Sequence, residues 1–126
     1  MKTAIFAPHA PQAIGPYSQA IKAGDWVFVS GQLPLEPEGG AMPAGVAEQT
    51  DRCLRNVAVS LGKAGLEMKH VVKTTVFMTD LGQFAAMNEV YAKHFQVPCP
   101  ARAAVQVAAL PKGAAVEIEA VAFAGT

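Results

Sequence analysis

Charged residues are scarce in this sequence, and neither sign is in excess. They make up 16% of the chain, with 10 lysines and arginines against 10 aspartates and glutamates, whereas about 25% is usual for a globular domain. Without a basic surplus the chain cannot gain affinity by releasing counterions from phosphates, so nucleic acid is not its expected partner. A small neutral chain also has little self-repulsion, and we expect it to self-associate.

Long apolar runs and a cysteine framework are also missing. No stretch approaches the roughly 18 apolar residues that cross a bilayer, which excludes a membrane span. The apolar stretch before Pro8 is too short for a secretory signal. The only two cysteines, Cys53 and Cys99, lack the spacing of metal ligands. We therefore expect reduced thiols and a cytoplasmic protein.

The remaining sequence predicts one α+β domain spanning residues 1–126. Its length suits a single core, and 52% of its residues are hydrophobic. The expected elements are a hairpin of strands 17–23 and 26–30, a loop over 31–45, a helix over 46–64, a strand over 70–79, a second helix from Asp80 to about residue 95, strands over 103–109 and 115–124, and a short strand near residues 2–6. Two helices, each between strands, predict an α+β or split βαβ layer, a mixed sheet with both helices on one face. The other face then requires cover, and a second copy of the chain can supply it.

Each predicted helix carries an apolar stripe. The stripe of the first helix includes Cys53, which we expect to be buried and inert. In the second helix, Asp80 and Gln83 match a capping box, and Asn88 lies in the middle of the apolar arc. An amide in that position should be buried or at an interface, and it must be hydrogen-bonded. It either fixes a neighbouring loop or faces a ligand.

Two glutamates interrupt the last strand. Glu117 and Glu119 share a strand face, roughly 6.6 Å apart along it. Val121 and Phe123 continue that face, which is therefore unlike an ordinary solvent-exposed one. Either the two carboxylates form ion pairs at a sheet edge, or one of them acts as an acid, a base or a water-positioning group.

Arg102 is the only charged residue between Lys93 and Lys112. Its planar guanidinium suits bidentate capture of a carboxylate. The alternative is an ion pair with a glutamate of a neighbouring strand. Tyr17 and Ser30 stand at strand ends beside glycine, where both pockets and plain turns occur.

The histidines and glycines indicate no other kind of site. His9, His70 and His94 have no second metal ligand three or four positions away on a helix face, and His94 suits the C-terminal end of a helix dipole. No phosphate-binding glycine loop and no nucleophile elbow occurs.

Several segments resemble the Rid (YjgF-type) family, and its RidA branch in particular. They cover most of the chain in order: residues 13–17 (AIGPY), 30–34 (SGQLP), 72–77 (VKTTVF), 80–91, 100–107 (PARAAVQV), 110–112 (LPK) and 116–120 (VEIEA). The most specific of them contains Arg102.

The resemblance implies a chorismate-mutase-like fold assembled as a homotrimer, with ligand sites between subunits. It implies hydrolysis of reactive 2-imino acids to 2-keto acids and ammonia, without a metal or an organic cofactor. The family's carboxylate-binding arginine corresponds to Arg102, and its water-positioning glutamate to Glu117. Its other pocket positions fall on Tyr17, Ser30, Gly31, Asn88 and Ala104.

One pocket position departs from the family pattern. Ala104 replaces a common cysteine, which removes any thiol contribution but leaves the backbone groups at that position. Ala103, Gln106 and Ala109 also differ from the usual residues. A trimer that binds keto acids without catalysis is the alternative function. A ribonuclease or translation inhibitor fits the neutral charge least.

Overall fold

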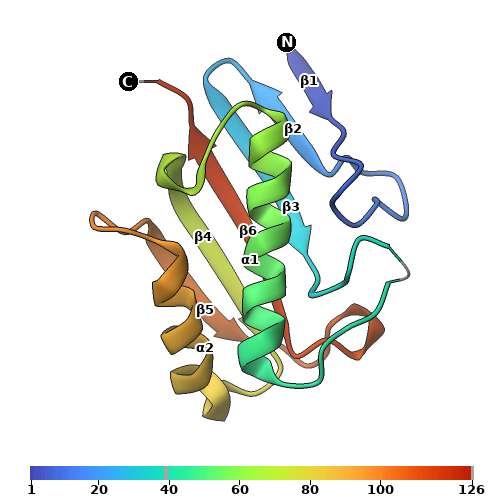
Figure 1. Cartoon of the computed structure of the whole chain (residues 1–126), viewed down its shortest axis with the longest axis vertical. Helices are drawn as coiled ribbons and strands as arrows, with labels where there is room; N and C mark the ends of the chain where they lie inside the picture. Colours follow the sequence, from blue (N-terminus) through green and yellow to red (C-terminus); the bar gives the residue numbers. More distant parts are fainter. Residues whose placement is uncertain (39, 126) are drawn as a thin grey trace.

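A computed structural model describes residues 1–38 and 40–125 as one six-stranded sheet with two helices packed against it (Figure 1). The strands are β1 (Lys2–Ile5), β2 (Ala20–Ala23), β3 (Trp26–Gln32), β4 (Val71–Met78), β5 (Ala101–Gln106) and β6 (Val116–Phe123). The helices are α1 (Val46–Lys63) and α2 (Phe84–Tyr91), and the short 3-10 turns are η1 (Met68–His70), η2 (Leu81–Gln83), η3 (Ala92–His94) and η4 (Pro111–Gly113).

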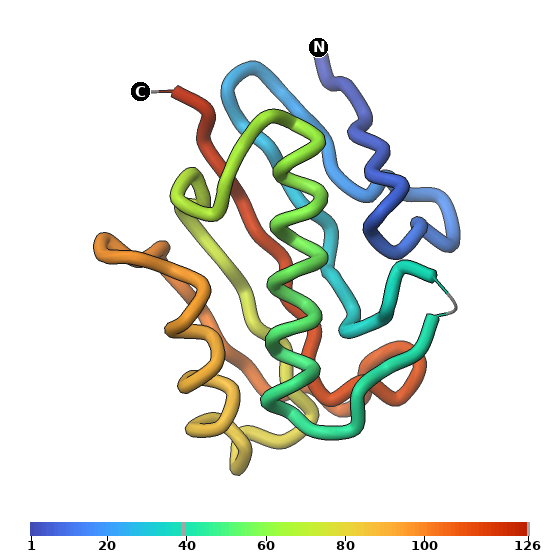
Figure 2. Tube along the Cα trace, viewed as in Figure 1, coloured from blue at the N-terminus to red at the C-terminus, as the bar shows by residue number. Residues whose placement is uncertain are grey.

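The sheet is mixed, and its strand order is β1-β2-β3-β6-β4-β5. Only β4 and β5 are parallel, and all the other neighbours are antiparallel. Since β6 pairs antiparallel with both β3 and β4, it lies inserted between two strands that run the same way. This is the predicted split βαβ arrangement. Figure 2 shows both chain termini at the same end of the molecule.

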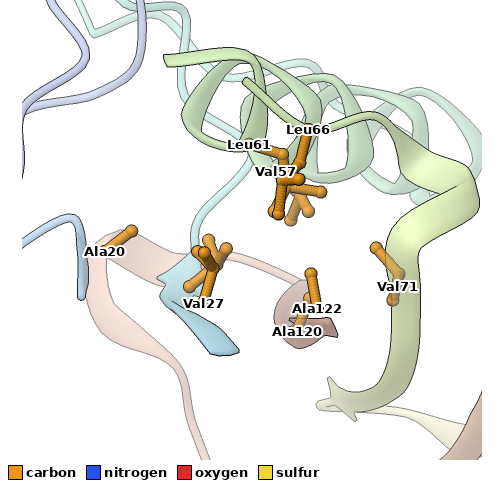
Figure 3. Close-up of a cluster of buried hydrophobic side chains, with 9 residues drawn as sticks. Ala20, Val27, Val57, Leu61, Leu66, Val71, Ala120 and Ala122 are labelled. Carbon is orange, nitrogen blue, oxygen red and sulfur yellow. The ribbon is translucent and has the colours of Figure 1, made fainter. Parts of the chain in front are cut away.

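Helix α1 forms where the sequence predicted it, because its apolar residues follow the helical period. Thr50, Cys53, Leu54, Val57 and Leu61 are all completely buried. Figure 3 shows Val57 and Leu61 directed from the helix toward side chains of the sheet. Burying a leucine or valine side chain contributes about 1.5–3 kcal/mol, so this stripe anchors α1 on the sheet.

The second helical segment is shorter than predicted. Asp80 is an N-cap, as expected, and its Oδ1 accepts a hydrogen bond of 2.8 Å from the Gly82 amide. No capping box with Gln83 forms; η2 intervenes, and α2 begins only at Phe84. The chain leaves α-geometry after Tyr91 and passes through η3.

Burial on the sheet alternates, and the two helices cover only one face. Val116, Ile118 and Ala120 of β6 are buried beneath the helices. The open face carries Trp26 and Phe28, which remain 44% and 47% exposed. The expectation that both helices lie on one sheet face is therefore confirmed, while the cover of the other face stays a prediction.

Several expectations about neighbours and boundaries are wrong. Strand β2 begins only at Ala20, and β5 spans Ala101–Gln106 instead of 103–109. Strands β5 and β6 are not adjacent, because β4 lies between them, so Arg102 and the two glutamates are not on neighbouring strands. The predicted loop 31–45 begins two residues later, since β3 continues through Gln32; its residue 39 lies outside the described residues.

Candidate functional site

A cavity of about 610 Å³ opens at the end of β3. Its lining comes from the end of β3, from the first half of β6 and from loops that lie on one side of the molecule in Figure 2. The lining residues are Pro11, Gln12, Ile14, Tyr17, Gln19, Ser30, Gly31, Gln32, Leu33, Leu35, Pro111, Lys112, Glu117 and Glu119. Four residues that the resemblance implicates, Tyr17, Ser30, Gly31 and Glu117, are thus brought together.

Glu117 lies directly against the backbone of Gly31. A β-carbon built on Gly31 lies 2.5 Å from Oε2 of Glu117 and 3.0 Å from its Cδ, so a side chain at position 31 would displace the carboxylate. The β3–β6 pairing shifts register between Val29 and Gln32, which places Ser30 and Gly31 in a bulge. Such bulges redirect side chains next to active sites. This one places Gly31, which has no side chain, where the Glu117 carboxylate lies.

The carboxyl group of Glu117 is easier to protonate than an ordinary glutamate. Partial burial raises the pKa of Glu117, and the neighbouring Glu119 carboxylate raises it further. Both groups project from the open face of β6, two residues apart. A half-buried carboxyl group with a raised pKa is a stronger base than an ordinary glutamate and is suited to accept a proton from water.

The hydroxyl groups of Ser30 and Tyr17 are held by local hydrogen bonds. Ser30 Oγ donates to the Ser18 carbonyl over 2.6 Å, which leaves only its lone pairs for another partner. Tyr17 is 53% exposed, and its hydroxyl accepts from the Ile14 amide at 3.3 Å. Both side chains border the cavity, and each has one hydrogen bond to the backbone.

Two buried amides, which the sequence interpretation missed, hold the cavity wall. The side chain of Gln19 bonds the backbone of Ala7 through both its oxygen and its nitrogen, and it also donates to Pro11 O at 2.8 Å. Asn56, completely buried, donates to the carbonyls of Leu33 and Leu35 at 3.0 Å each. Position 56 follows Cys53 by three residues and therefore lies on the same buried face of α1. A buried amide needs hydrogen-bond partners, and this could have identified Asn56 from the sequence.

Arg102 does not line this cavity. Its Nη1 donates to Asn88 Oδ1 at 2.7 Å, and its guanidinium carbon lies 4.7 Å from the ring centroid of Tyr91 and 5.3 Å from that of Phe84. These three partners occupy positions i, i+4 and i+7 of the α2 region and form one stripe. The structure thus shows Asn88 as the hydrogen-bond partner of Arg102. Asn88 is hydrogen-bonded, as expected, but it is exposed in the single chain, so of the two expected placements only one at an interface between chains stays a prediction.

No ion pair joins Arg102 to Glu117 or Glu119 within the described part of the chain, residues 1–38 and 40–125. Arg102 and Ala104 point to the helix-covered side of β5, where Ala104 packs against the core cluster around Val76 and Met78. The cavity glutamates point to the open side. Within one chain the predicted site residues therefore form two separate groups.

His94 and the cysteines have structural surroundings. His94 Nε2 lies 2.8 Å from Asp51 Oδ1 and so links η3 to α1. Cys53 is buried, and its burial raises the pKa of the thiol, which favours the unreactive protonated form. Cys99 is exposed. No helix of the described residues is long and apolar enough to span a bilayer.

A family model and several known proteins match most of this chain. A family model described as Endoribonuclease L-PSP matches residues 7–124. The RutC family protein y4sK of Sinorhizobium fredii is 56% identical over 89% of this chain and 90% of its own length. The 2-iminobutanoate/2-iminopropanoate deaminase of Mus musculus is 46% identical over 99% of this chain and 93% of its own length.

Solved structures share the whole fold. The crystal structure of TdcF from E. coli with bound serine is 45% identical, with a TM-score of 0.92 over 98% of this chain and 99% of that one. RidA from the Antarctic bacterium Psychrobacter sp. is also 45% identical, with a TM-score of 0.93 over 96% of this chain and 98% of that one.

Proposed function

This chain belongs to the Rid (YjgF-type) family, and we propose that it hydrolyses reactive 2-imino acids and their enamine tautomers to 2-keto acids and ammonia. The observation that carries the proposal is the half-buried carboxyl group of Glu117. It has a raised pKa, and it lines a cavity of about 610 Å³. The mammalian relatives named as deaminases support the same reaction.

In the proposed reaction Arg102 binds the substrate carboxylate. A guanidinium presents parallel N–H donors that match the two oxygens of a carboxylate, and these charge-assisted bonds orient C2 of the substrate. Asn88 already occupies one Nη1 donor of Arg102 and keeps the group in place. The serine bound to E. coli TdcF supports a ligand of this size and class.

Glu117 positions and deprotonates the attacking water. As the water oxygen bonds to C2, the C=N π electrons move to nitrogen, and the water proton passes to the Glu117 carboxylate. That carboxyl group returns the proton to the nitrogen, which completes the neutral carbinolamine. The Glu117 carboxylate then takes the proton of the C2 hydroxyl and passes it to the nitrogen, so that the C–N bond breaks, ammonia leaves and the hydroxyl oxygen becomes the carbonyl oxygen of the keto acid. General acid–base help of this kind is worth about 10²–10⁴-fold, which suits an imine that already hydrolyses in water.

The proposed assembly is a homotrimer with its sites between copies. Arg102 and Glu117 point to opposite faces of one sheet, so a ligand that touches both needs Arg102 from one copy and Glu117 from another. Burial of the open sheet face, with Trp26 and Phe28, supplies the apolar contact. Tyr17, Ser30, Gly31 and the backbone of Ala104 complete the substrate pocket. Ala104 contributes no thiol, so the mechanism runs without one.

The test is an assay in which a threonine dehydratase supplies the imine. We expect the protein to accelerate imine loss and ammonia release. Arg102→Ala should abolish this effect while the circular dichroism spectrum stays unchanged. Arg55→Ala is the matched control, since Arg55 is an exposed arginine of α1 paired with Asp51. Full activity in Arg102→Ala would remove Arg102 from the mechanism.

The same assay separates catalysis from binding alone. A non-catalytic trimer would bind a 2-keto acid such as 2-oxobutanoate, measured by calorimetry, without changing the rate of imine loss. The raised pKa of Glu117 favours catalysis, because a purely binding pocket for an anion gains nothing from a proton-accepting carboxylate.

A further inference from the structure

We propose that Tyr91, tied to Thr74, is a positioning residue that fixes the guanidinium of Arg102 for carboxylate capture; this rests on the proposed role of Arg102. Figure 1 shows α2 lying over β5, the strand that carries Arg102. The guanidinium carbon lies 4.7 Å from the Tyr91 ring centroid, the shorter of its two aromatic contacts. A cation held over an aromatic face is attracted by the ring quadrupole.

The ring of Tyr91 is itself held at two points. Its hydroxyl oxygen lies 2.7 Å from Thr74 Oγ1, and both residues are buried, at 6% and 1% exposure. Its ring also packs against Phe95, with centroids 4.8 Å apart. Burial raises the pKa of Tyr91, so the phenol stays protonated and able to donate. The ring therefore has no freedom to turn away from Arg102.

Thr74 ties this contact to the sheet. In the β4–β5 ladder Thr74 is the direct partner of Arg102. The backbone that sets the origin of the Arg102 side chain thus also sets the hydroxyl that holds the Tyr91 ring. The β4–β5 pair therefore fixes the distance between the Tyr91 ring and the Arg102 guanidinium. The orientation of α2 is not the only thing that sets this distance.

A purely structural role explains this pair poorly. Valine and phenylalanine would fill the same buried space without two hydroxyl groups that must satisfy each other. In the present arrangement Asn88 takes one N–H of Arg102, and the rings lie near its face. The remaining edge of N–H donors is left for a carboxylate, so binding needs little further ordering of the side chain.

The test compares Tyr91→Phe, Thr74→Val and their double variant. Each single change breaks the 2.7 Å hydroxyl contact and keeps the surrounding volume. Val76→Ala is the control, since Val76 is a completely buried residue of the same strand in the same core cluster and its removal weakens the core without releasing the ring. The readouts are the Kd of 2-oxobutanoate by calorimetry, and KM and kcat in the coupled assay.

We expect each single variant to raise Kd and KM about three- to tenfold, with kcat within about twofold of wild type. The reason is that the contact orients Arg102 for binding the ligand carboxylate before the reaction starts. The double variant should be no weaker than either single one, since both break the same link. Values for Tyr91→Phe and Thr74→Val that equal those of Val76→Ala would overturn the proposal.

Chemical rescue gives a second readout that loss of stability does not produce. In Arg102→Ala, added guanidinium should restore binding of 2-oxobutanoate, because the site formed by Tyr91, Phe84 and Asn88 remains. It should not do so in Arg102→Ala combined with Tyr91→Leu. Equal rescue in both backgrounds, or none in the first, contradicts the proposal. If Arg102→Ala alone keeps wild-type affinity, the proposed function of Arg102 fails instead.

Discussion

Arg102 and Glu117 project from opposite faces of one sheet, and β4 separates the strands that carry them. Arg102 contacts the rings of α2 on the covered face. Glu117 alternates with the completely buried Val116 and Ile118, so it points to the open face. Two groups in this relation cannot hold one small ligand within a single chain, and this makes self-association a condition of the proposed chemistry.

The open face should therefore control both assembly and activity. Phe28→Glu places a charge on this face where the native ring is 47% exposed, and burying an unpaired charge in an interface is costly. We expect sedimentation analysis to show a trimer for wild type and monomer for the variant, with loss of deaminase activity. Lys93→Glu, a charge change on the helix side, should leave the trimer intact. A monomeric wild type that is fully active would contradict the intersubunit site.

Removal of the proposed base should reduce turnover more than binding. Glu117→Gln keeps the size of the side chain but cannot accept the water proton. We expect kcat to fall by about 10²–10⁴-fold, while the Kd of 2-oxobutanoate changes little. An unchanged kcat in the coupled assay would show that Glu117 only shapes the cavity.

The activity should fall on the acid side at a pH set by two glutamates. Because the carboxylate form of Glu117 is the active one, protonation at low pH removes the base, and its raised pKa moves this loss toward neutral pH. Glu119→Gln deletes the neighbouring charge that contributes to the raised pKa. The acid limb of the kcat profile should then shift to lower pH. A limb that stays in place would mean that another group titrates.

A side chain at position 31 should disturb Glu117. The β-carbon of Gly31→Ala would lie 2.5 Å from the Glu117 carboxylate oxygen, so the carboxylate must move. We expect a loss of at least about tenfold in kcat/KM, since displaced catalytic groups lose their alignment. Gly62→Ala is the matched control: nothing lies within 4 Å of its added carbon, and alanine should stabilise α1 by about 0.5–1 kcal/mol. Equal activity of the two variants would argue against the close approach.

The buried amide of Asn56 should contribute strongly to stability. Asn56→Ala removes both hydrogen bonds to the carbonyls of Leu33 and Leu35. Two buried acceptors left without partners cost about 1–3 kcal/mol each. Urea unfolding should show a loss of about 2–5 kcal/mol, against less than about 0.5 kcal/mol for the exposed Arg55→Ala. A loss as small as the control's would mean that water replaces the amide.

The sequence predicted the elements better than their neighbours. Helix α1 and the alternation along β6 were predictable because helical and strand periods are local properties of the chain. The shorter α2 was not, because the 3-10 turns at both its ends depend on contacts outside the segment. The residues of the cavity were recognisable individually, through the resemblance, but the amides Gln19 and Asn56 were not, since their partners are backbone groups of distant loops.

By itself the sequence determined the α+β class, the apolar stripe of α1 and the isolation of Arg102, Glu117 and Glu119 in a weakly charged chain. Only the tertiary structure decided that β6 inserts between β3 and β4. Strand pairing joins segments far apart in the chain, and no local pattern specifies which edge a strand joins. That one insertion puts β4 between Arg102 and Glu117 and leaves the sheet face that carries Glu117 open. The sparse charge favoured self-association, and the order of the strands adds a structural reason for it, because Arg102 and Glu117 of one chain cannot contact the same ligand.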